Sequence, residues 1–309
     1  LIAGNALMYR SYHEVKFNPT YEDQPFGTVY GFTSGILYAV EHFQPSYCIV
    51  AFDTKEKTFR HKMDENYKAQ RSKAPDDFYP QLPFLDEMLE TFGIAIQRKP
   101  GFEADDIIGT LAIQSAQKEL DTYIMSHDMD YSQLVNNRIK LCRAAGRIHE
   151  EHIMDEAGVL QKLGVPPSQV VDYKAIVGDS SDNFKGIPGI GPKGAIELLE
   201  LFGSLEVLLS KMEEIPDKYK SKFEGQIEAV HHCQKLAQIE IKVPVDNDMN
   251  STDIFVPKFD DLAQICGKWG FRGIVSRAQK MGSGIDSGSG SDQNISSKKD
   301  DPEDQMSLF

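Results

Sequence analysis

The sequence contains few cysteines and no long apolar run. Only four of its 309 residues are cysteine, at positions 48, 142, 233 and 266, and they form no C-x-x-C pair. This spacing argues against a zinc site, and we expect four reduced, buried thiols in a cytoplasmic protein. No stretch of about 18 consecutive apolar residues is present, so we expect no membrane span and no membrane partner. Charged residues between positions 10 and 16 argue against a signal peptide.

Positive charge is also scarce, since the formal net charge is −14. Taken alone, this value argues against nucleic-acid binding, which needs Lys and Arg to contact phosphates. Residues 54–73 are an exception, with seven Lys or Arg against three Asp or Glu. Acids gather elsewhere, in "FEADD", "SHDMD" and "GDSSDN". Each cluster alone is typical of a solvated loop, but together they are typical of a metal-dependent enzyme that acts on a polyanion.

Apolar, β-branched runs alternate with helical patterns in the first half of the chain. The runs at 1–5, 48–53 and 122–130 predict strands, and the patterns at 28–43, 78–93 and 104–120 predict helices. This alternation predicts an α/β fold with a parallel sheet, in which ligands bind beyond the carboxyl ends of the strands. From about residue 150 onward, short helical patterns separated by Gly and Pro predict a helical domain.

A glycine-rich loop, "GIPGIGPKGA", contains the spacing G-x-G-x-x-G at Gly189, Gly191 and Gly194. A dinucleotide-binding loop must follow a strand, but the preceding "VGDSSDNFK" is polar and rich in turn residues. The alternative is a helix, a glycine hairpin and a second helix. Such a hairpin presents backbone N–H groups to a phosphate at a helix N-terminus. Gly186 opens this loop, and Lys185 and Lys193 flank it.

Acidic side chains are expected to meet at one edge of the sheet. They come from four segments and comprise Asp53, Glu103, Asp105, Asp106, Asp128, Asp130, Asp179 and Asp182. The spacing predicts that residues 128 and 130 share one face of a strand end, and that 179 and 182 share one face of a helical turn. So many carboxylates need cations, and oxygen ligands suit Mg²⁺ or Mn²⁺. Two such ions would serve displacement at phosphorus.

The order of these motifs, "FD…FR…YKxxR…EADD…DxD…GDSSDN…GIPGIGPK", resembles the 5′-nuclease of bacterial DNA polymerase I and its flap-endonuclease relatives over about residues 1–281. The resemblance implies a PIN-like core at 1–160 with a helical arch at about 54–77. It also implies a helical DNA-binding domain at 161–281, with a helix-hairpin-helix at about 171–202. The implied activity is that of a metal-dependent 5′-3′ exonuclease and 5′-flap endonuclease acting on DNA in replication and repair.

The resemblance also assigns residues. It implies that the eight acids bind two metal ions and that Lys68 and Arg71 contact the scissile phosphate. Further DNA-binding residues would be Arg10, Arg60 and Tyr67, and Phe59 and Tyr67 are expected to stack on bases. In this family the hairpin also binds a monovalent cation, so K⁺ is expected at the carbonyls around Gly186–Gly191.

The sequence departs from the family at its first strand. The stretch reads "LIAGN", so Ala3 stands where relatives have a metal-binding Asp. One hypothesis is a nuclease whose activity is impaired by this change. The alternative is a DNA-binding module that holds branched DNA without cutting it. A PIN-type ribonuclease is a third reading, disfavoured because such domains lack the hairpin domain.

The last segment, 282–309, is rich in Ser, Gly and Asp and predicts a disordered tail. It ends in "QMSLF", which resembles the peptide that docks on the bacterial sliding clamp, through Gln305, Met306, Leu308 and Phe309. We therefore expect a monomer in the bacterial cytoplasm, associated with the nucleoid, whose partners are DNA with 5′ flaps or 5′ ends and the clamp. Residues are expected to precede Leu1. Both a stand-alone nuclease and a domain of a longer polymerase remain open.

Overall fold

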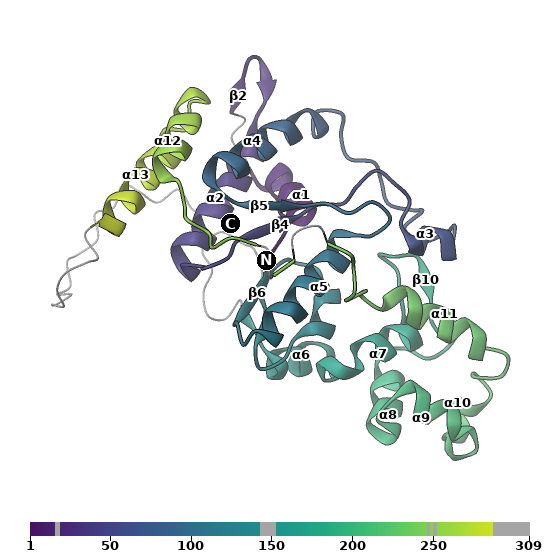
Figure 1. Cartoon of the computed structure of the whole chain (residues 1–309). Coiled ribbons are helices and arrows are strands. Elements are labelled where there is room, and N and C mark those ends of the chain that lie inside the picture. Colours follow the sequence, from purple (N-terminus) through teal and green to yellow (C-terminus); the bar gives the residue numbers. More distant parts are fainter. Residues whose placement is uncertain (16–18, 143–152, 246–247, 250–251, 287–309) are drawn as a thin grey trace, which may run out of the picture.

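A six-stranded sheet forms the centre of the protein in a computed structural model that describes residues 1–15, 19–142, 153–245, 248–249 and 252–286 (Figure 1). In sheet order the strands are β5 Ala95–Gln97, β4 Ile49–Ala51, β1 Ile2–Ala3, β6 Thr122–Met125, β7 Ile139–Cys142 and β8 Ile153–Met154. Neighbouring strands run parallel except β7 and β8. The predicted parallel α/β sheet is therefore confirmed, with one antiparallel strand added beside β7.

The three predicted strands are present but shorter than expected. β1 ends at residue 3, β4 at 51 and β6 at 125, and a turn or helix follows each one. In register, Ile2 lies opposite Val50 of β4 and Met125 of β6. The segments that follow these three parallel strands therefore emerge side by side at one edge of the sheet. That edge is where the acidic motifs lie in the sequence.

Two apolar clusters pack on opposite faces of the sheet because alternate strand residues point to opposite sides. Ile49 and Ala51 join one cluster, whereas Val50 joins the other. One face is covered by α1 (Gly4–Glu14), α2 (Gly27–Phe43) and α4 (Leu82–Phe92), and the other by α5 (Ala104–Gln117) (Figure 1). The three helices predicted at 28–43, 78–93 and 104–120 are confirmed, although the second begins as a 3₁₀ turn, Tyr79–Gln81.

Local signals explain where two of these helices begin and end. Glu103 and Asp106 form a capping box at the start of α5, in which each side chain accepts a hydrogen bond from the backbone N–H of the other. α4 ends at Gly93, whose φ of +87° permits the left-handed turn that leads into β5. The capping box means that part of the "EADD" motif organises the helix itself.

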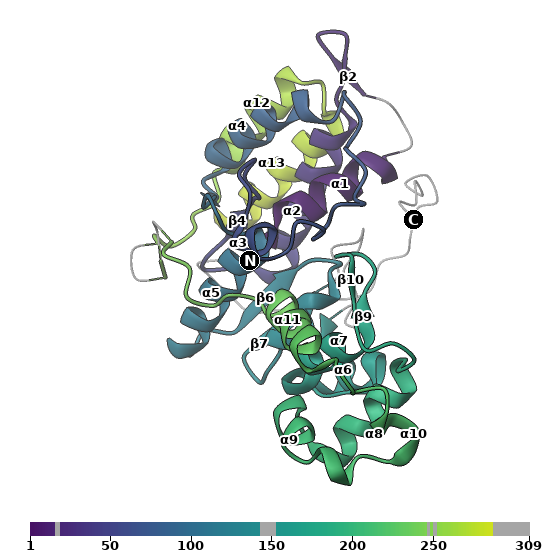
Figure 2. The ribbon, with the colours of Figure 1, turned by 90° about the vertical axis from the view of Figure 1, so that its right-hand side faces the viewer.

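The helical domain lies beside the lower edge of the sheet in Figures 1 and 2. It contains α6 Glu156–Leu163, α7 Val170–Val177, α8 Pro192–Phe202, α9 Leu205–Ser210, α10 Asp217–Lys220 and α11 Ile227–Ala237. A two-stranded hairpin, β9 Gly178–Asp179 and β10 Phe184–Lys185, connects α7 to the glycine loop that precedes α8. The predicted helix, glycine-rich loop and second helix are therefore present in this order, and the β9–β10 hairpin lies between the first helix and the loop.

The last two helices do not belong to the helical domain. α12 (Phe259–Lys268) packs on α4, and α13 (Arg272–Asp286) packs on α12 and α2. In the connection between the two helices, Trp269 and Phe271 contact Phe26 in the core beside α2. The prediction that the second domain extends to 281 is therefore wrong, because the apolar faces of these helices complete the core. α13 also covers the first five residues of the expected tail, and 287–309 lie outside the described residues.

The segment 54–77, which we call the arch segment, is mostly not helical. It contains one short helix, α3 (Phe59–Met63), followed by turns. Three of its basic side chains, on Arg60, Lys68 and Arg71, form ion pairs with acids of the sheet edge. These ion pairs hold the segment against α5 and the β9–β10 hairpin. A small hairpin, β2 Thr20–Tyr21 and β3 Gln24–Pro25, precedes α2.

Candidate active site

Three of the predicted acids, Asp53, Asp105 and Asp128, lie beyond the carboxyl edge of the sheet without an ion-pair partner among the described residues. Asp53 follows β4 and accepts a hydrogen bond from the backbone N–H of Ala104 at 2.8 Å. Asp105 accepts one from the Tyr131 hydroxyl. Asp128 caps the 3₁₀ helix Met129–Leu134. Each of these hydrogen bonds orients a carboxylate, but none supplies a positive charge.

The pKa values show that these carboxylates repel one another. Burial, then the negative charges of Asp130 and Asp105, raise the pKa of Asp128 to about 8. Burial also raises the pKa of Asp105 to about 6, despite the nearby positive charge of Lys68. Closely spaced carboxylates of this kind are stabilised by a cation, and an oxygen-only donor set suits Mg²⁺ or Mn²⁺ rather than Zn²⁺. The donor chemistry of Asp53, Asp105 and Asp128 therefore suits a hard divalent ion, but among the described residues these side chains do not converge closely enough to enclose one.

Two lysines hold three other acids. The Lys174 ammonium lies between Asp130 and Asp179, 2.7 Å from an oxygen of Asp179. The Lys68 ammonium lies 2.9 and 3.0 Å from the two oxygens of Glu103. Burial would raise the pKa of Asp179, but Lys174 and hydrogen bonds from Ser181 outweigh it and hold that pKa at about 2. These acids are therefore neutralised by the chain itself.

The eight acids consequently do not form one cluster. Within the residues that the structure describes, no three Asp, Glu, His or Cys side chains converge closely enough to enclose a metal ion. Three of the acids have no ion pair among the described residues, Asp130 and Asp179 pair with Lys174, and the other three, Glu103, Asp106 and Asp182, pair with basic residues of the arch segment. Sequence spacing did not reveal this division, because it depends on which cations fold back onto the edge.

Asp106 and Arg60 form a buried ion pair that contradicts both of their predicted roles. Arg60 donates to the two oxygens of Asp106 at 2.9 and 2.8 Å, to an oxygen of Glu103 at 3.3 Å, and to the carbonyls of Leu236 and Gln238. The Asp106 side chain is fully buried and also accepts two backbone hydrogen bonds. Neither group has room for a metal ion or a DNA phosphate. The pair instead ties the arch segment to α5 and to the chain that leaves α11.

Tyr67 is likewise too buried for its predicted role in stacking on bases. Only 3% of its surface is exposed, and its hydroxyl contacts Glu103 at 3.1 Å and Asp182 at 2.9 Å. Arg71 also donates to Asp182, at 2.8 Å, but half of its side chain is exposed. Phe59 is half-buried beside the Phe102 ring. Of the arch residues, Arg71 and the partly exposed Lys68 face the edge where a phosphate would bind.

The predicted spacing relationships within two acid pairs are wrong. Asp128 and Asp130 do not share a strand face, because β6 has ended and the Asp128 side chain accepts the Asp130 N–H at 2.9 Å. Asp179 belongs to β9, whereas Asp182 lies in the hairpin turn before Asn183, which has a φ of +60°. Asp179 accepts N–H groups from this turn, so it organises the hairpin as well as binding Lys174.

Ala3 lies at the end of β1, between the strands that lead to Asp53 and Asp128. It is buried and supplies no ligand. The next two residues have structural roles. A side chain at Gly4 would approach the Phe52 ring to 2.5 Å, and the Asn5 side chain accepts the Asp53 N–H at 2.8 Å. Arg10, on α1, pairs with Glu14 and contacts His127 beside the acidic edge.

In the glycine-rich loop, two positions require glycine, one because of a close contact and one because of its backbone conformation. A side chain at Gly186 would lie 2.2 Å from the Ile176 carbonyl oxygen, and Gly189 has a φ of +81°. Gly191 caps α8 without a side-chain hydrogen bond, so no N-cap side chain accepts the N–H groups in the first turn after Pro192. Gly194 is buried against Tyr219, which leaves it a packing position. Lys185 and Lys193 are exposed beside the loop.

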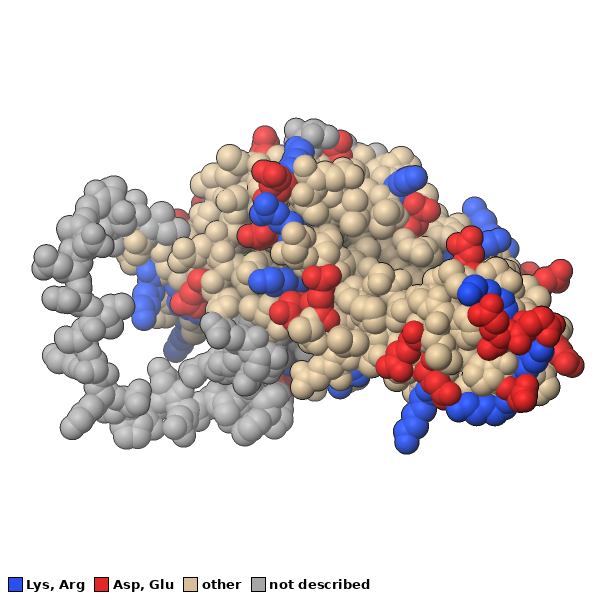
Figure 3. All heavy atoms as spheres, turned by 90° about the horizontal axis from the view of Figure 1, so that it is seen from below, with Lys and Arg blue, Asp and Glu red and all other residues tan. Residues whose placement is uncertain are grey.

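The sequence did not reveal a further lysine, Lys222, that contacts the glycine-rich loop. Lys222 donates to the Gly189 carbonyl at 2.6 Å, and Cys233 donates to the Lys185 carbonyl at 3.1 Å. Each of these two carbonyls accepts a hydrogen bond within the chain, and the potassium ion expected at the carbonyls of residues 186–191 stays a prediction. Ion pairs of the helical domain include Lys218–Glu197 and Lys220–Glu213. Seen from below, basic and acidic side chains are intermixed toward the right-hand end of the molecule (Figure 3).

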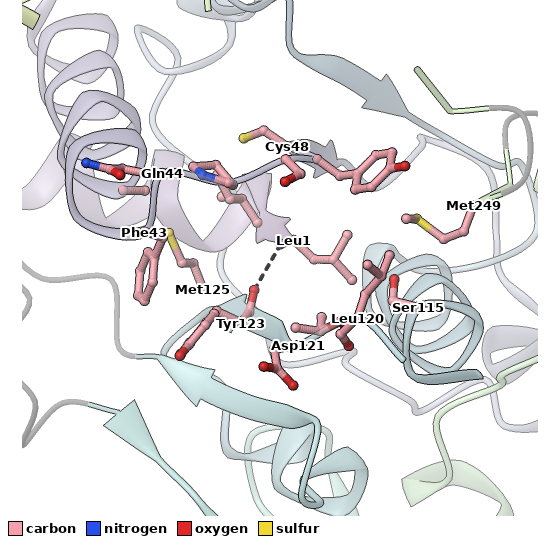
Figure 4. A pocket seen from close by; sticks show the side chains of 16 residues that line it. Leu1, Phe43, Gln44, Cys48, Ser115, Leu120, Asp121, Tyr123, Met125 and Met249 are labelled. Carbon is pink, nitrogen blue, oxygen red and sulfur yellow. Dashed lines mark hydrogen bonds between the residues drawn. The ribbon is translucent and has the colours of Figure 1, made fainter. Parts of the chain in front are cut away.

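A pocket of about 370 Å³ lies at the opposite end of β1 (Figure 4). Leu1, Phe43, Cys48, Leu120 and Met125 contribute to its lining, and Asp121 is its one acidic side chain. The Leu1 ammonium donates to the Tyr123 carbonyl at 2.9 Å. This pocket holds no group of catalytic side chains and lies away from the acidic edge.

Within the described residues, no helix is long and apolar enough to cross a membrane.

The sequence matches two neighbouring family profiles. Residues 1–164 match the 5′-3′ exonuclease N-terminal resolvase-like domain, and residues 165–260 match the 5′-3′ exonuclease C-terminal SAM fold. The chain is 36% identical over 261 residues to DNA polymerase I of Chloroflexus aurantiacus. That match covers 83% of this chain but 28% of the relative, so the chain spans under a third of the length of such curated relatives.

Solved structures of nucleases share the fold. One is a bacteriophage T5 flap endonuclease in a pseudo-enzyme-product complex with DNA and metal ions, with a TM-score of 0.62 and 18% identity. It covers 91% of this chain and 97% of its own. The catalytic core of Rad2 in complex with DNA substrate has a TM-score of 0.55 and 19% identity, covering 85% and 84% of the two chains. At these identities the likeness extends to the fold alone.

Proposed function

The chain belongs to the 5′-3′ exonuclease family, and we propose that it is a metal-dependent nuclease acting on DNA with 5′ ends or 5′ flaps. The observation that carries this proposal is the group of three carboxylates without ion pairs, Asp53, Asp105 and Asp128, beside Lys68 and Arg71. Negative groups that favour a cation and positive groups that favour a phosphate lie at the same edge. A phosphodiester bond brought to this edge would meet both.

Divalent Mg²⁺ or Mn²⁺ would be held by Asp53, Asp105 and Asp128, with Glu103, Asp130 and Asp179 as further carboxylates nearby. When bound, such an ion polarises the phosphoryl oxygen and favours ionisation of water. The chain itself would orient the substrate. Lys68 and Arg71 would exchange their contacts with Glu103 and Asp182 for the DNA phosphate, because both ammonium and guanidinium groups bind phosphate oxygens strongly.

The helix-hairpin-helix is proposed to bind the duplex. The first turn of α8, which has no N-cap side chain, and the exposed Lys185 and Lys193 would provide N–H donors and positive charge for a backbone phosphate. Gly191, where an added Cβ would meet open space, leaves the loop free of a side chain at the surface that DNA would approach. This contact is independent of sequence, in keeping with a structure-specific nuclease.

A second candidate function is DNA binding without cleavage, and Ala3 favours it. The position between β4 and β6 holds a methyl group where a carboxylate would stand beside Asp53 and Asp128. The site then has one ligand fewer, and the ion would be bound more weakly or in the wrong place. This candidate predicts normal affinity for branched DNA with no product.

A labelled 5′-flap substrate with Mg²⁺ tests both candidates. The wild-type chain, the Ala3→Asp variant and the Asp53→Asn variant would be compared for binding without metal and for cleavage with it. Cleavage by the wild type that is lost in Asp53→Asn supports the nuclease. Binding without cleavage, restored by Ala3→Asp, supports the binding module. Failure of all three proteins to bind flap DNA more tightly than blunt duplex would refute both.

We further propose recruitment by the sliding clamp through residues 305–309, which lie outside the described residues. A short apolar peptide on a polar tail suits tethering of an enzyme to a partner. Deleting 305–309 is expected to abolish clamp binding in surface plasmon resonance and to leave flap binding unchanged. Clamp binding that survives the deletion would contradict the proposal.

A further inference from the structure

The arch segment is fastened to one turn of the helical domain. That turn, residues 180–183 between β9 and β10, is called the hairpin turn below, and it contacts residues 66–71 of the arch segment. Three hydrogen bonds between them include no ionised group. They join the Lys68 N–H to the Asp182 carbonyl at 3.0 Å, the Asn183 side-chain amide to the Asn66 carbonyl at 2.7 Å, and the Gln70 side-chain amide to the Ser180 carbonyl at 2.5 Å.

The hairpin turn is itself held firmly by the helical domain. The Asp179 side chain accepts the N–H and the hydroxyl of Ser181 at 2.7 and 2.6 Å, and the N–H of Asp182 at 3.3 Å. At the base of the hairpin, a side chain at Gly186 would lie 2.4 Å from the Gly178 nitrogen, so the two backbones pack directly on each other. The hairpin turn is therefore fixed relative to the glycine-rich loop that follows β10, and it provides an anchor for the arch segment.

The charged contacts of the arch segment are the ones that a phosphate would replace. Arg71 donates to the Asp182 carboxylate at 2.8 Å, and the Lys68 ammonium contacts Glu103 at 2.9 Å. In the proposed function both groups exchange these carboxylates for a DNA phosphate. The three uncharged hydrogen bonds can persist through this exchange, because none of them includes the Lys68 ammonium or the Arg71 guanidinium. They are the contacts that can hold the arch segment once its ion pairs are broken.

Two residues at this contact have a left-handed backbone. The φ angle is +56° at Lys68 and +60° at Asn183. Asn tolerates this region better than most residues, whereas Lys adopts it uncommonly. The hydrogen bond from the Lys68 N–H to the hairpin turn helps to hold this conformation, in which the Lys68 ammonium reaches Glu103. The contact with the hairpin turn therefore supports the backbone conformation that directs this lysine toward the acidic edge.

From this geometry we propose that Asn183 and Gln70 are positioning residues, which keep Lys68 and Arg71 at the acidic edge while those two groups exchange carboxylates for phosphate. The proposal rests on the proposed binding of flap DNA. Neither amide contacts the DNA in this account. Each acts through the main chain, by fixing residues 66–71 on the hairpin turn before the substrate arrives. Positioning of this kind reduces the conformational freedom that the segment loses when DNA binds.

A purely structural role for the two amides makes a different forecast. If they only stabilise the fold, their loss lowers the free energy of unfolding and leaves the DNA affinity of the folded protein unchanged. If they position Lys68 and Arg71, their loss weakens binding of a 5′ flap. Binding of a blunt duplex, which the helix-hairpin-helix is proposed to hold, stays unchanged. The ratio of the two affinities separates these roles without any metal ion or any measurement of cleavage.

The first variant is Asn183→Gly, which removes the amide and keeps a residue that accepts a positive φ. Gln44→Gly is its matched control, because Gln44 is an exposed amide residue with a φ of +44° at the end of α2. Hydrogen exchange of residues 66–71 would be measured in the free protein, and DNA affinity by fluorescence anisotropy in EDTA. For Asn183→Gly we expect exchange on the order of fivefold faster and flap affinity on the order of fivefold weaker, the effect of one hydrogen bond. Blunt-duplex affinity should not change, and the control should match the wild type throughout.

A second variant keeps the test informative if the hairpin turn does not fold with glycine. Gln70→Met removes the other amide at a similar side-chain length, and Gln161→Met, at an exposed position on α6, is its control. The same results are expected. Unchanged exchange in both variants would overturn the tether, and faster exchange with unchanged flap affinity would overturn the positioning role. A wild-type chain that binds flap DNA no more tightly than blunt duplex would overturn the proposed function and this role together, a result that is distinct because it needs no variant.

Discussion

The buried pair of Arg60 and Asp106 offers a direct test of how the arch segment is held. Their side chains are 3% and 0% exposed, and two hydrogen bonds of 2.9 and 2.8 Å join them. In Arg60→Met the Asp106 carboxylate keeps only the backbone N–H groups of Glu103 and Glu240. Removing one partner of a buried ion pair costs about 3–5 kcal/mol, because the other charge stays buried without compensation.

We therefore expect Arg60→Met to lower the free energy of unfolding by about 3–5 kcal/mol, measured by urea denaturation at neutral pH. Asp106→Asn alone is expected to cost less, because Arg60 keeps the Glu103 carboxylate and the carbonyls of Leu236 and Gln238. The double variant should be more stable than the sum of the two single effects implies, since it leaves no isolated buried charge.

Arg277→Met is the matched control. Arg277 pairs with Glu41 across α13 and α2, but 31% of its side chain and 54% of that of Glu41 are exposed. Its loss is expected to cost less than about 1 kcal/mol. The reasoning fails if Arg60→Met costs no more than this control, or if the single and double variants are additive. An Arg60→Met protein of normal stability with lost DNA affinity would instead restore the predicted DNA-binding role.

Three other expectations concern glycine, metal and thiol chemistry. Gly186→Ala should lower the free energy of unfolding by at least about 2 kcal/mol, because its Cβ would meet backbone atoms at 2.2–2.4 Å, whereas Gly191→Ala, with open space around it, should have little effect. The pKa of Asp128 is about 8 in the folded protein and about 3.9 in an unfolded chain. The folded state therefore loses stability as the pH rises from the lower to the higher of these two values. Added Mg²⁺ should therefore raise the melting temperature more at pH 8 than at pH 6.5, and an equal shift at both would contradict this. Burial raises the pKa of Cys142 and Cys266 to about 12, so neither should react with a thiol reagent at pH 8 until the protein is denatured.

The sequence was sufficient for the features that depend on local patterns. The alternation of strands and helices gave the parallel sheet, and the glycine spacing gave the helix, hairpin and helix. All four cysteines are buried, as their isolated positions predicted. The carboxyl edge could also be predicted, because parallel strands place the residues that follow them side by side.

The roles of individual charged residues could not be predicted in the same way. Asp105 and Asp106 are neighbours in the sequence, yet one faces the edge and the other is fully buried against Arg60. The difference arises because Asp106 occupies the third position of the α5 capping box. Its E-x-x-D spacing was a signal that could have identified this role. Lys174 carried a weaker signal, a single basic residue on the helix before "GDSSDN".

The last two helices were assigned to the wrong domain for a related reason. Their amphipathic patterns show that each has an apolar face but do not show which surface covers it. In the structure, Phe259 contacts Phe92 of α4, and Phe271 contacts Tyr30 of α2. Such pairings join residues far apart in the chain and have no local signature.

Because α12 and α13 pack against the helices of the sheet domain, the core of that domain is built from two separate parts of the chain. The helical domain is inserted between them. The first 142 residues contain most of the sheet, but the apolar surface around Phe26 and Phe92 is completed only by residues 255–281. During synthesis, that surface remains uncovered until the helical domain has left the ribosome, so long-range contacts must close the core late. A chain truncated after residue 164, where the match to the N-terminal family profile ends, would lack α12 and α13, the helices that complete this core. The core of the sheet domain is therefore incomplete without residues 255–281.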